Sequence, residues 1–223
     1  MKYKIIVLLA ALLLILVGCQ NDEEKIKSLM LSDLEERYYE KFEIVDFNYN
    51  KVNHFYEAGV QTEKTKAGYA AEVTYSPDDG VFDEYYTHLY CIEVTNELKK
   101  LIELSDDYYM YTMFPISIVT PREVDISYDS FVTYADLENT VINCYVYFPI
   151  GSKELEEVRE KITNAAMGLD NPNCNISIYF VSEETISDVK YFITNHYKIY
   201  DDDKLSYDWD EQIQIKKRDG KIL

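Results

Sequence analysis

Hydrophobic and polar residues alternate along two segments of the C-terminal half of the chain, residues 142–148 and 174–180. This alternation is typical of β-strands that bury only one face, because successive side chains of a strand point to opposite sides. One face of each predicted strand is apolar. The opposite face carries Asn143, Tyr145 and Tyr147 in the first strand, and Asn175, Ser177 and Tyr179 in the second. The pattern therefore predicts a half-buried sheet with a face rich in tyrosine.

Four other segments carry apolar residues at the three- to four-residue spacing of an amphipathic helix. The first is predicted to begin at Asn21 or Asp22, because either residue can cap a helix and Glu23 and Glu24 place negative charge in its first turn. The other three predicted helices cover residues 84–104, 152–169 and 182–197.

Shorter alternating stretches complete the pattern. They predict strands at residues 44–50, 69–75, 108–119, 123–128 and 209–215, and a loop at the polar, aperiodic residues 51–66. This order of elements predicts an α+β fold with mixed or antiparallel sheets and helices packed mainly on one face. In the C-terminal half, the order strand, helix, strand, helix, strand predicts crossover connections that place the helices against the sheet.

A break in the pattern at Thr120 and Pro121 predicts the boundary between two small lobes. The N-terminal α+β lobe is expected to span residues 25–119 and the C-terminal α+β lobe residues 120–223. The two lobes have similar size, but no repeated sequence relates them.

The N-terminus combines a short positive segment with an apolar run and a cysteine. Lys2 and Lys4 precede the 13 apolar residues 5–17, which are followed by Gly18 and Cys19. A bilayer-spanning helix needs about 20 apolar residues, so the run fits a secretory signal peptide better than a permanent membrane helix.

The end of this leader, a small residue followed by cysteine, resembles the lipobox of bacterial lipoproteins. The resemblance covers residues 1–19 only. It implies that residues 1–18 are removed and that Cys19 receives a diacylglyceryl group, which anchors the chain in the lipid bilayer. Residues 19–24 would then be a short tether that holds the folded part close to the extracytoplasmic face of the cell membrane.

Charge limits the range of partners. The formal net charge is −19, so the chain repels nucleic acid and anionic lipid headgroups. Nucleic-acid binding is therefore disfavoured. The compact basic cluster Lys216, Lys217 and Arg218 lies among acidic residues, which favours a solvated strand end over a binding patch.

Three cysteines remain besides Cys19, and each of them falls within an apolar pattern. We interpret Cys91, Cys144 and Cys174 as buried free thiols. A disulfide between Cys144 and Cys174 is the alternative, because an exported protein meets oxidising conditions.

Catalytic motifs are missing from the sequence. It contains neither the GxSxG motif of serine hydrolases nor a phosphate-binding glycine loop. The candidate histidines for a catalytic triad are His54, His88 and His196. His88 and Cys91 could share a helix face as a nucleophile pair or as two zinc ligands, but a core cysteine beside a surface histidine is the simpler interpretation.

Two acidic turns supply oxygen ligands without the spacing of a calcium loop: residues 78–84 and 201–211. No cofactor and no metal site are predicted, and a carboxylate pair for glycoside cleavage cannot be chosen among 41 acidic residues.

The sequence thus favours a membrane-anchored, non-catalytic binding or interaction module. Tyr145, Tyr147 and Tyr179 form the predicted recognition face, for a protein or a cell-wall ligand. One alternative is a cell-envelope substrate-binding protein or hydrolase with a site between the lobes. Another is that the tyrosines only pack one lobe on the other. The 22 tyrosines, together with abundant Asn, Ile, Asp and Lys, are also typical of an AT-rich genome such as that of a low-GC Gram-positive bacterium.

Overall fold

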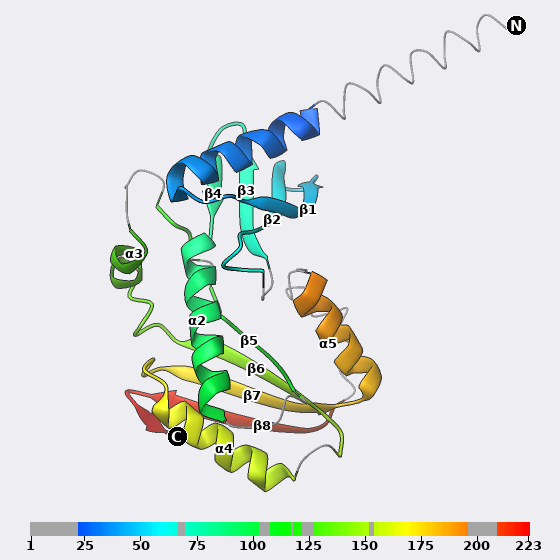
Figure 1. Ribbon diagram of the computed structural model, residues 1–223, viewed down its shortest axis with the longest axis vertical. Coiled ribbons are helices and arrows are strands. Elements are labelled where there is room, and N and C mark those ends of the chain that lie inside the picture. Colours follow the sequence, from blue (N-terminus) through cyan, green and yellow to red (C-terminus); the bar gives the residue numbers. More distant parts are fainter. Residues whose placement is uncertain are drawn as a thin grey trace, which may run out of the picture.

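The computed structural model describes residues 22–66, 70–102, 108–116, 118–121, 127–151, 154–195 and 209–223. In these ranges the protein is an α+β fold with one four-stranded and one five-stranded sheet (Figure 1). The strands of the first sheet are β1 (Glu43–Asn50), β2 (Phe55–Gln61), β3 (Ala71–Ser76) and β4 (Gly80–Asp83). Those of the second are β5 (Tyr109–Met113), β6 (Ile142–Pro149), β7 (Cys174–Val181), β8 (Trp209–Arg218) and β9 (Lys221–Ile222). The labelled helices are α2 (Tyr85–Ile102), α3 (Tyr128–Tyr134), α4 (Leu155–Gly168) and α5 (Glu183–Asn195).

A helix over residues 22–38 precedes β1 and packs on the antiparallel sheet β1-β2-β3-β4. Met30 and Leu34 lie on its buried face and pack into one cluster with Val60 and Val73 of the sheet. The spacing of apolar residues thus identified this helix and its inward face correctly. The predicted loop at residues 51–66 was wrong in part, because β2 lies within it. The alternation in β2 is weak because small residues, Ala58 and Gly59, occupy its centre.

Helix α2 joins the two sheets. Tyr85, at its first turn, belongs to the core of the four-stranded sheet, whereas Val94, Leu98 and Ile102 belong to the core of the five-stranded sheet. At 18 residues and 1.5 Å per residue, α2 is about 27 Å long, which lets it reach both cores.

The chain passes from one sheet to the other earlier than the break at Thr120 and Pro121. Strand β5 pairs with β6 in the five-stranded sheet, although it precedes residue 120. The segment around residue 120 then returns to the first lobe, since the Thr120 amide donates to the carbonyl oxygen of Asp83 at 2.9 Å. The two lobes are therefore interleaved around α2 and not divided at one point of the chain.

The five-stranded sheet is mixed, with the order β5-β6-β7-β8-β9. Strands β6 and β7 are parallel and connected through α4, as the sequence predicted. Strand β8 is antiparallel to β7, so the second predicted crossover is wrong. Helices α2 and α4 cover one face of the sheet, and α5 lies over part of the opposite face (Figure 1).

Two further differences concern the region between β5 and β6. The predicted strand at residues 123–128 lies almost entirely outside the described residues. The sequence did not predict α3, which begins after Ser127; the side chain of Ser127 accepts a hydrogen bond from the Ser130 amide.

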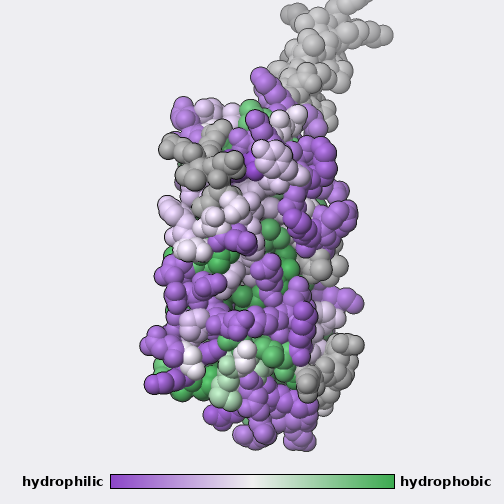
Figure 2. Space-filling view, turned by 60° about the vertical axis from the view of Figure 1, so that its left-hand side comes forward, coloured by the Kyte–Doolittle hydropathy of each residue, from purple (hydrophilic) through white to green (hydrophobic). Residues whose placement is uncertain are grey.

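Polar residues cover most of the molecular face shown in Figure 2, and apolar residues form separate patches in its lower half. Within the described ranges, no helix combines the length and the hydropathy needed to cross a bilayer.

Candidate functional site: the tyrosine face of the five-stranded sheet

Strand register places the residues of the candidate site in rows across one face of the five-stranded sheet. We call this the tyrosine face; its members have odd residue numbers on β5, β6 and β7 and even residue numbers on β8. One row contains Met113, Asn143, Asn175 and Lys216, and the next contains Tyr111, Tyr145, Ser177 and Gln214. A third row contains Tyr109, Tyr147 and Tyr179. The face is therefore aromatic toward β5 and polar toward β8.

The tyrosines form a stacked layer. The ring centroids of Tyr111 and Tyr145 are 5.0 Å apart, and those of Tyr147 and Tyr179 are 5.1 Å apart, with interplanar angles of 20° and 18°. Stacked aromatic pairs of this kind stabilise a sheet beyond the area that they bury.

Helix α5 covers part of this layer. Val189 packs in one cluster with Tyr111 and Tyr147, and Ile186 and Ile193 flank them. Tyr147 is 1% exposed, so it cannot contact a partner in this conformation. Tyr145 and Tyr179 are half-buried. The three predicted recognition residues do share one face, but only two of them reach its surface.

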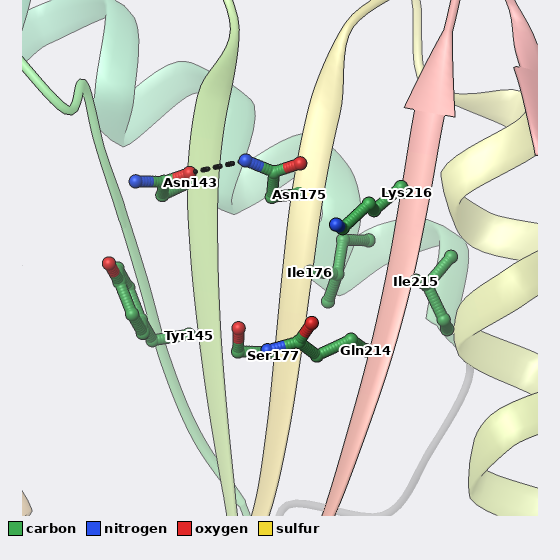
Figure 3. Close-up of a pocket in the computed structure, with 8 residues that line it drawn as sticks. All are labelled: Asn143, Tyr145, Asn175, Ile176, Ser177, Gln214, Ile215 and Lys216. Atoms are coloured by element: carbon green, nitrogen blue, oxygen red, sulfur yellow. Dashed lines mark hydrogen bonds between the residues drawn. The ribbon is translucent and has the colours of Figure 1, made fainter. Parts of the chain in front are cut away.

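A hollow of ≈ 240 Å³ lies beside the tyrosine layer, on the part of the face that faces β8 (Figure 3). Its side chains come from β6, β7 and β8. The polar members of the lining are Asn143, Tyr145, Asn175, Ser177, Gln214 and Lys216. We call this feature the polar hollow.

The amides of the hollow are held in a chain of hydrogen bonds that starts at Arg218. Arg218 donates from Nη2 to Oδ1 of Asn175 at 2.7 Å. Asn175 in turn donates from Nδ2 to Oδ1 of Asn143 at 2.9 Å (Figure 3). A guanidinium can only donate, so it orients the oxygen of Asn175 toward itself. The same logic turns the oxygen of Asn143 toward Asn175 and leaves the Asn143 NH2 group pointing away from it.

The hollow differs in charge from the chain as a whole. Lys216 is exposed at its rim, and the described residues that line it include no carboxylate. The expectation of a solvated basic strand end was therefore wrong for two of the three residues. Lys217 is 2% exposed and donates to the carbonyl oxygen of Leu169 at 2.6 Å, while Arg218 is half-buried and also donates to the carbonyl oxygens of Cys174 and Lys217.

A larger groove of ≈ 560 Å³ lies between the helix at residues 22–38 and β1. Its lining carries Glu24, Glu35 and Glu43 together with Lys27, and Lys27 forms an ion pair with Glu24 at 3.0 Å. The charges in this groove are therefore mixed and partly paired, unlike those of the polar hollow.

The cysteines agree with the preferred interpretation. Cys91, Cys144 and Cys174 are buried free thiols. Cys144 lies opposite Ile176, and Cys174 lies opposite Ile142, so the two cysteines are two residues out of register on neighbouring strands. Burial raises the pKa of both the Cys144 and the Cys174 thiol, which keeps them protonated and unreactive.

His88 and Cys91 do not form a surface pair. His88 is 3% exposed and Cys91 2%, so the expected surface histidine is a core residue. In the part of the chain that the structure describes, no group of three or more His, Cys, Asp and Glu residues is placed to hold a metal ion.

The acidic turn at residues 78–84 separates into two environments. Asp79 accepts a hydrogen bond from the Ser76 hydroxyl at 2.9 Å at the exposed turn. Asp83 is buried, where it accepts hydrogen bonds from Arg37 and, at 2.6 Å, from the Tyr38 hydroxyl. Residues 201–208 of the second acidic segment lie outside the described residues, as does Cys19.

The residues that sequence reasoning missed are the amides and Lys216. The sequence did contain a signal for the amides, because they alternate with apolar residues in the same way as the tyrosines do. These polar residues are Asn143, Asn175, Ser177 and Gln214. What the alternation could not show was the alignment of three strands that places these residues beside one another.

Comparison with known proteins shows the fold alone. No family model matches the chain, and no curated protein matches it. One similar solved structure is the crystal structure of a DUF5037 family protein from Ruminococcus gnavus ATCC 29149, at 2.55 Å resolution. The match has a TM-score of 0.65 and 14% sequence identity, and it covers 86% of this chain and 92% of that chain.

Proposed function

We propose that this protein is a bacterial lipoprotein that anchors a non-catalytic binding module to the extracytoplasmic face of the cell membrane. The observation that carries the proposal is the N-terminal sequence, in which an apolar leader ends at Gly18 and Cys19. Two acyl chains on Cys19 would suffice for stable attachment. We propose a protein or cell-wall component as the partner of this module.

The tether between the anchor and the folded part is short. The described part of the first helix starts at residue 22, so residues 20 and 21 lie between it and Cys19 in the sequence. At about 3.5 Å per residue, a linker of this length can span at most about 10 Å. The first helix and the five-stranded sheet lie at opposite ends of the molecule, so the sheet would stand away from the membrane (Figure 1).

The chemistry of the polar hollow supports binding over catalysis. General acid–base catalysis needs a group that exchanges protons near neutral pH, most often a histidine or a carboxylate. The described residues that line the hollow include no histidine, carboxylate or thiol. They consist of amides, hydroxyls and one ammonium group, which bind polar ligands by hydrogen bonds.

The anchor is tested by comparing the full chain with a Cys19→Ser variant in a bacterial host. We expect the full chain to be found in the membrane fraction and to incorporate a clickable palmitate analogue, and the variant to lose the label. Cys91→Ala is the matched control, because it removes a buried cysteine that should carry no lipid. Equal labelling of the full chain and the Cys19→Ser variant would contradict the proposal.

A further inference from the structure

We infer that the polar hollow binds a sugar unit that carries one carboxylate, such as a uronic acid. This inference rests on the proposed function, because it names the ligand class of the proposed binding module. It is carried by the balance of hydrogen-bond donors and acceptors in the hollow, by its charge and by its size.

The hollow presents an excess of donors. Because Arg218 orients Asn175, and Asn175 orients Asn143, the Asn143 oxygen is already occupied as an acceptor. Among the described residues, none accepts a hydrogen bond from the Asn143 NH2 group. Lys216 adds an ammonium group with three donors and no acceptor. A ligand that fits this arrangement carries acceptor oxygens, and a carboxylate is acceptor-only.

The charge of the hollow, like its excess of hydrogen-bond donors, favours an anion. Lys216 faces the hollow, and Arg218 lies behind Asn175. Arg218 is bound by neutral amide and carbonyl oxygens, and among the described residues no carboxylate forms an ion pair with it. Since the chain as a whole has a net charge of −19, this local excess of positive charge discriminates among anions. A polyanion is repelled strongly by the rest of the surface, whereas a compact ligand with one carboxylate is repelled much less.

The remaining lining favours a hydroxylated ligand over an aliphatic acid. Ser177 and Gln214 lie opposite each other on β7 and β8, and each can both donate and accept. Sugar hydroxyls have the same dual character. Tyr145 borders the hollow, with its ring backed by Tyr111, and offers a rigid aromatic edge with a hydroxyl group. The hollow has a volume of ≈ 240 Å³, below the roughly 300–1,000 Å³ of clefts that enclose drug-sized ligands. A hollow of this size fits a single sugar unit.

Ligand-observed NMR titration of the full chain in a non-ionic detergent tests the inference. The probes are D-glucuronate, D-glucose, acetate and triglutamate. We expect glucuronate to bind at least about tenfold more tightly than the other three, since a hydrogen bond to a charged group changes affinity by that order. Equal binding of glucose, tighter binding of triglutamate, or the absence of glucuronate binding would each overturn the inference.

Two variants locate the binding in the hollow. Lys216→Ala and the isosteric Asn143→Asp should each weaken glucuronate binding by about tenfold or more, because one removes a cation and the other replaces a donor by an anionic acceptor. Lys161→Ala is the matched control, since Lys161 is an exposed lysine on α4, which packs on the opposite face of the sheet. If Lys161→Ala weakens binding as much as Lys216→Ala does, the inference fails. The membrane attachment is measured separately through Cys19, so failure of the ligand and failure of the anchor are distinguishable.

Discussion

Arg37 and Arg218 are both partly buried, but their partners differ in charge. Arg37, on the first helix, forms ion pairs with Asp33, at 2.5 Å, and with Asp83. Arg218, on β8, is bound by Asn175 and by two backbone carbonyl oxygens. The charge of Arg37 is neutralised by carboxylates and holds the first helix to the end of β4. The charge of Arg218 is hydrogen-bonded but is not neutralised by any carboxylate of the described residues, so we expect it to act on a ligand in the hollow.

This comparison assigns a structural role to one cluster and a binding role to the other. A buried ion pair destabilises a protein strongly when one partner is removed, because the remaining charge is left without compensation. Lys216, beside Arg218 at the hollow, is exposed, and an exposed cation contributes little to folding. Measurements of stability and of binding should therefore respond to different residues in the two clusters.

The largest expected effect is that of Arg37→Leu. We expect it to lower the free energy of unfolding by about 3–5 kcal/mol, because it leaves the buried carboxylate of Asp83 without its cation. Urea denaturation followed by circular dichroism measures the change. Lys161→Leu removes an exposed cation of a surface ion pair with Glu157 and should change stability by less than about 1 kcal/mol. A loss below about 1 kcal/mol in Arg37→Leu would remove the distinction between the clusters.

The loss in Arg37→Leu should depend on pH. Burial raises the pKa of Asp83 above its usual value, although Arg37 and Tyr38 oppose this shift. Between the unfolded and folded pKa values, the folded state then binds more protons than the unfolded state, so stability falls as pH rises. We expect the unfolding free energy of Arg37→Leu to decrease as the pH rises above about 4, because the unfolded pKa is about 3.9 and the folded pKa lies above it. The double variant Arg37→Leu/Asp83→Asn is the control; the same pH dependence in both would show that Asp83 is not the titrating group.

A smaller loss is expected for Arg218→Gln. Arg218 satisfies the carbonyl oxygens of Cys174 and Lys217, and its removal should cost about 1–2 kcal/mol in unfolding free energy. Thermal or urea unfolding measures this loss against Lys221→Gln, which changes an exposed lysine on the neighbouring β9. A loss as large as that of Arg37→Leu would mean that Arg218 is as structural as Arg37.

The smallest expected effect on folding is that of Lys216→Ala. Lys216 is exposed at the rim of the hollow, so its removal should change the unfolding free energy by no more than about 0.5 kcal/mol. The same urea titration provides the measurement. A loss above about 1 kcal/mol would make Lys216 a structural residue and would weaken its assignment to a binding site.

Much of the fold followed from periodicity. Alternation identified β6 and β7, and helical spacing identified the first helix, α2, α4 and α5, because each of these elements has one clearly apolar side. Strand β2 was missed because Ala58 and Gly59 at its centre weaken the contrast between its two faces. The direction of β8 was also not predictable, since alternation is the same in parallel and antiparallel strands.

The candidate site was predictable only in part. The tyrosines and the amides were assigned to one face of each strand, but their neighbours across strands depend on register, which the sequence of a single strand does not contain. The burial of Tyr147 follows from the packing of α5 on this face. Asp83 lies 46 residues from Arg37 and Asn175 lies 43 residues from Arg218 in the sequence, so the contrast between the two clusters emerges only in the folded chain.

Lipid anchoring is tested most directly by mass spectrometry of the mature N-terminus from membranes of producing cells. We expect a chain that begins at Cys19, lacks residues 1–18 and carries a diacylglyceryl group on the Cys19 sulfur. A chain that retains Met1 and an unmodified Cys19 thiol, or one cleaved elsewhere without lipid, would contradict lipid anchoring.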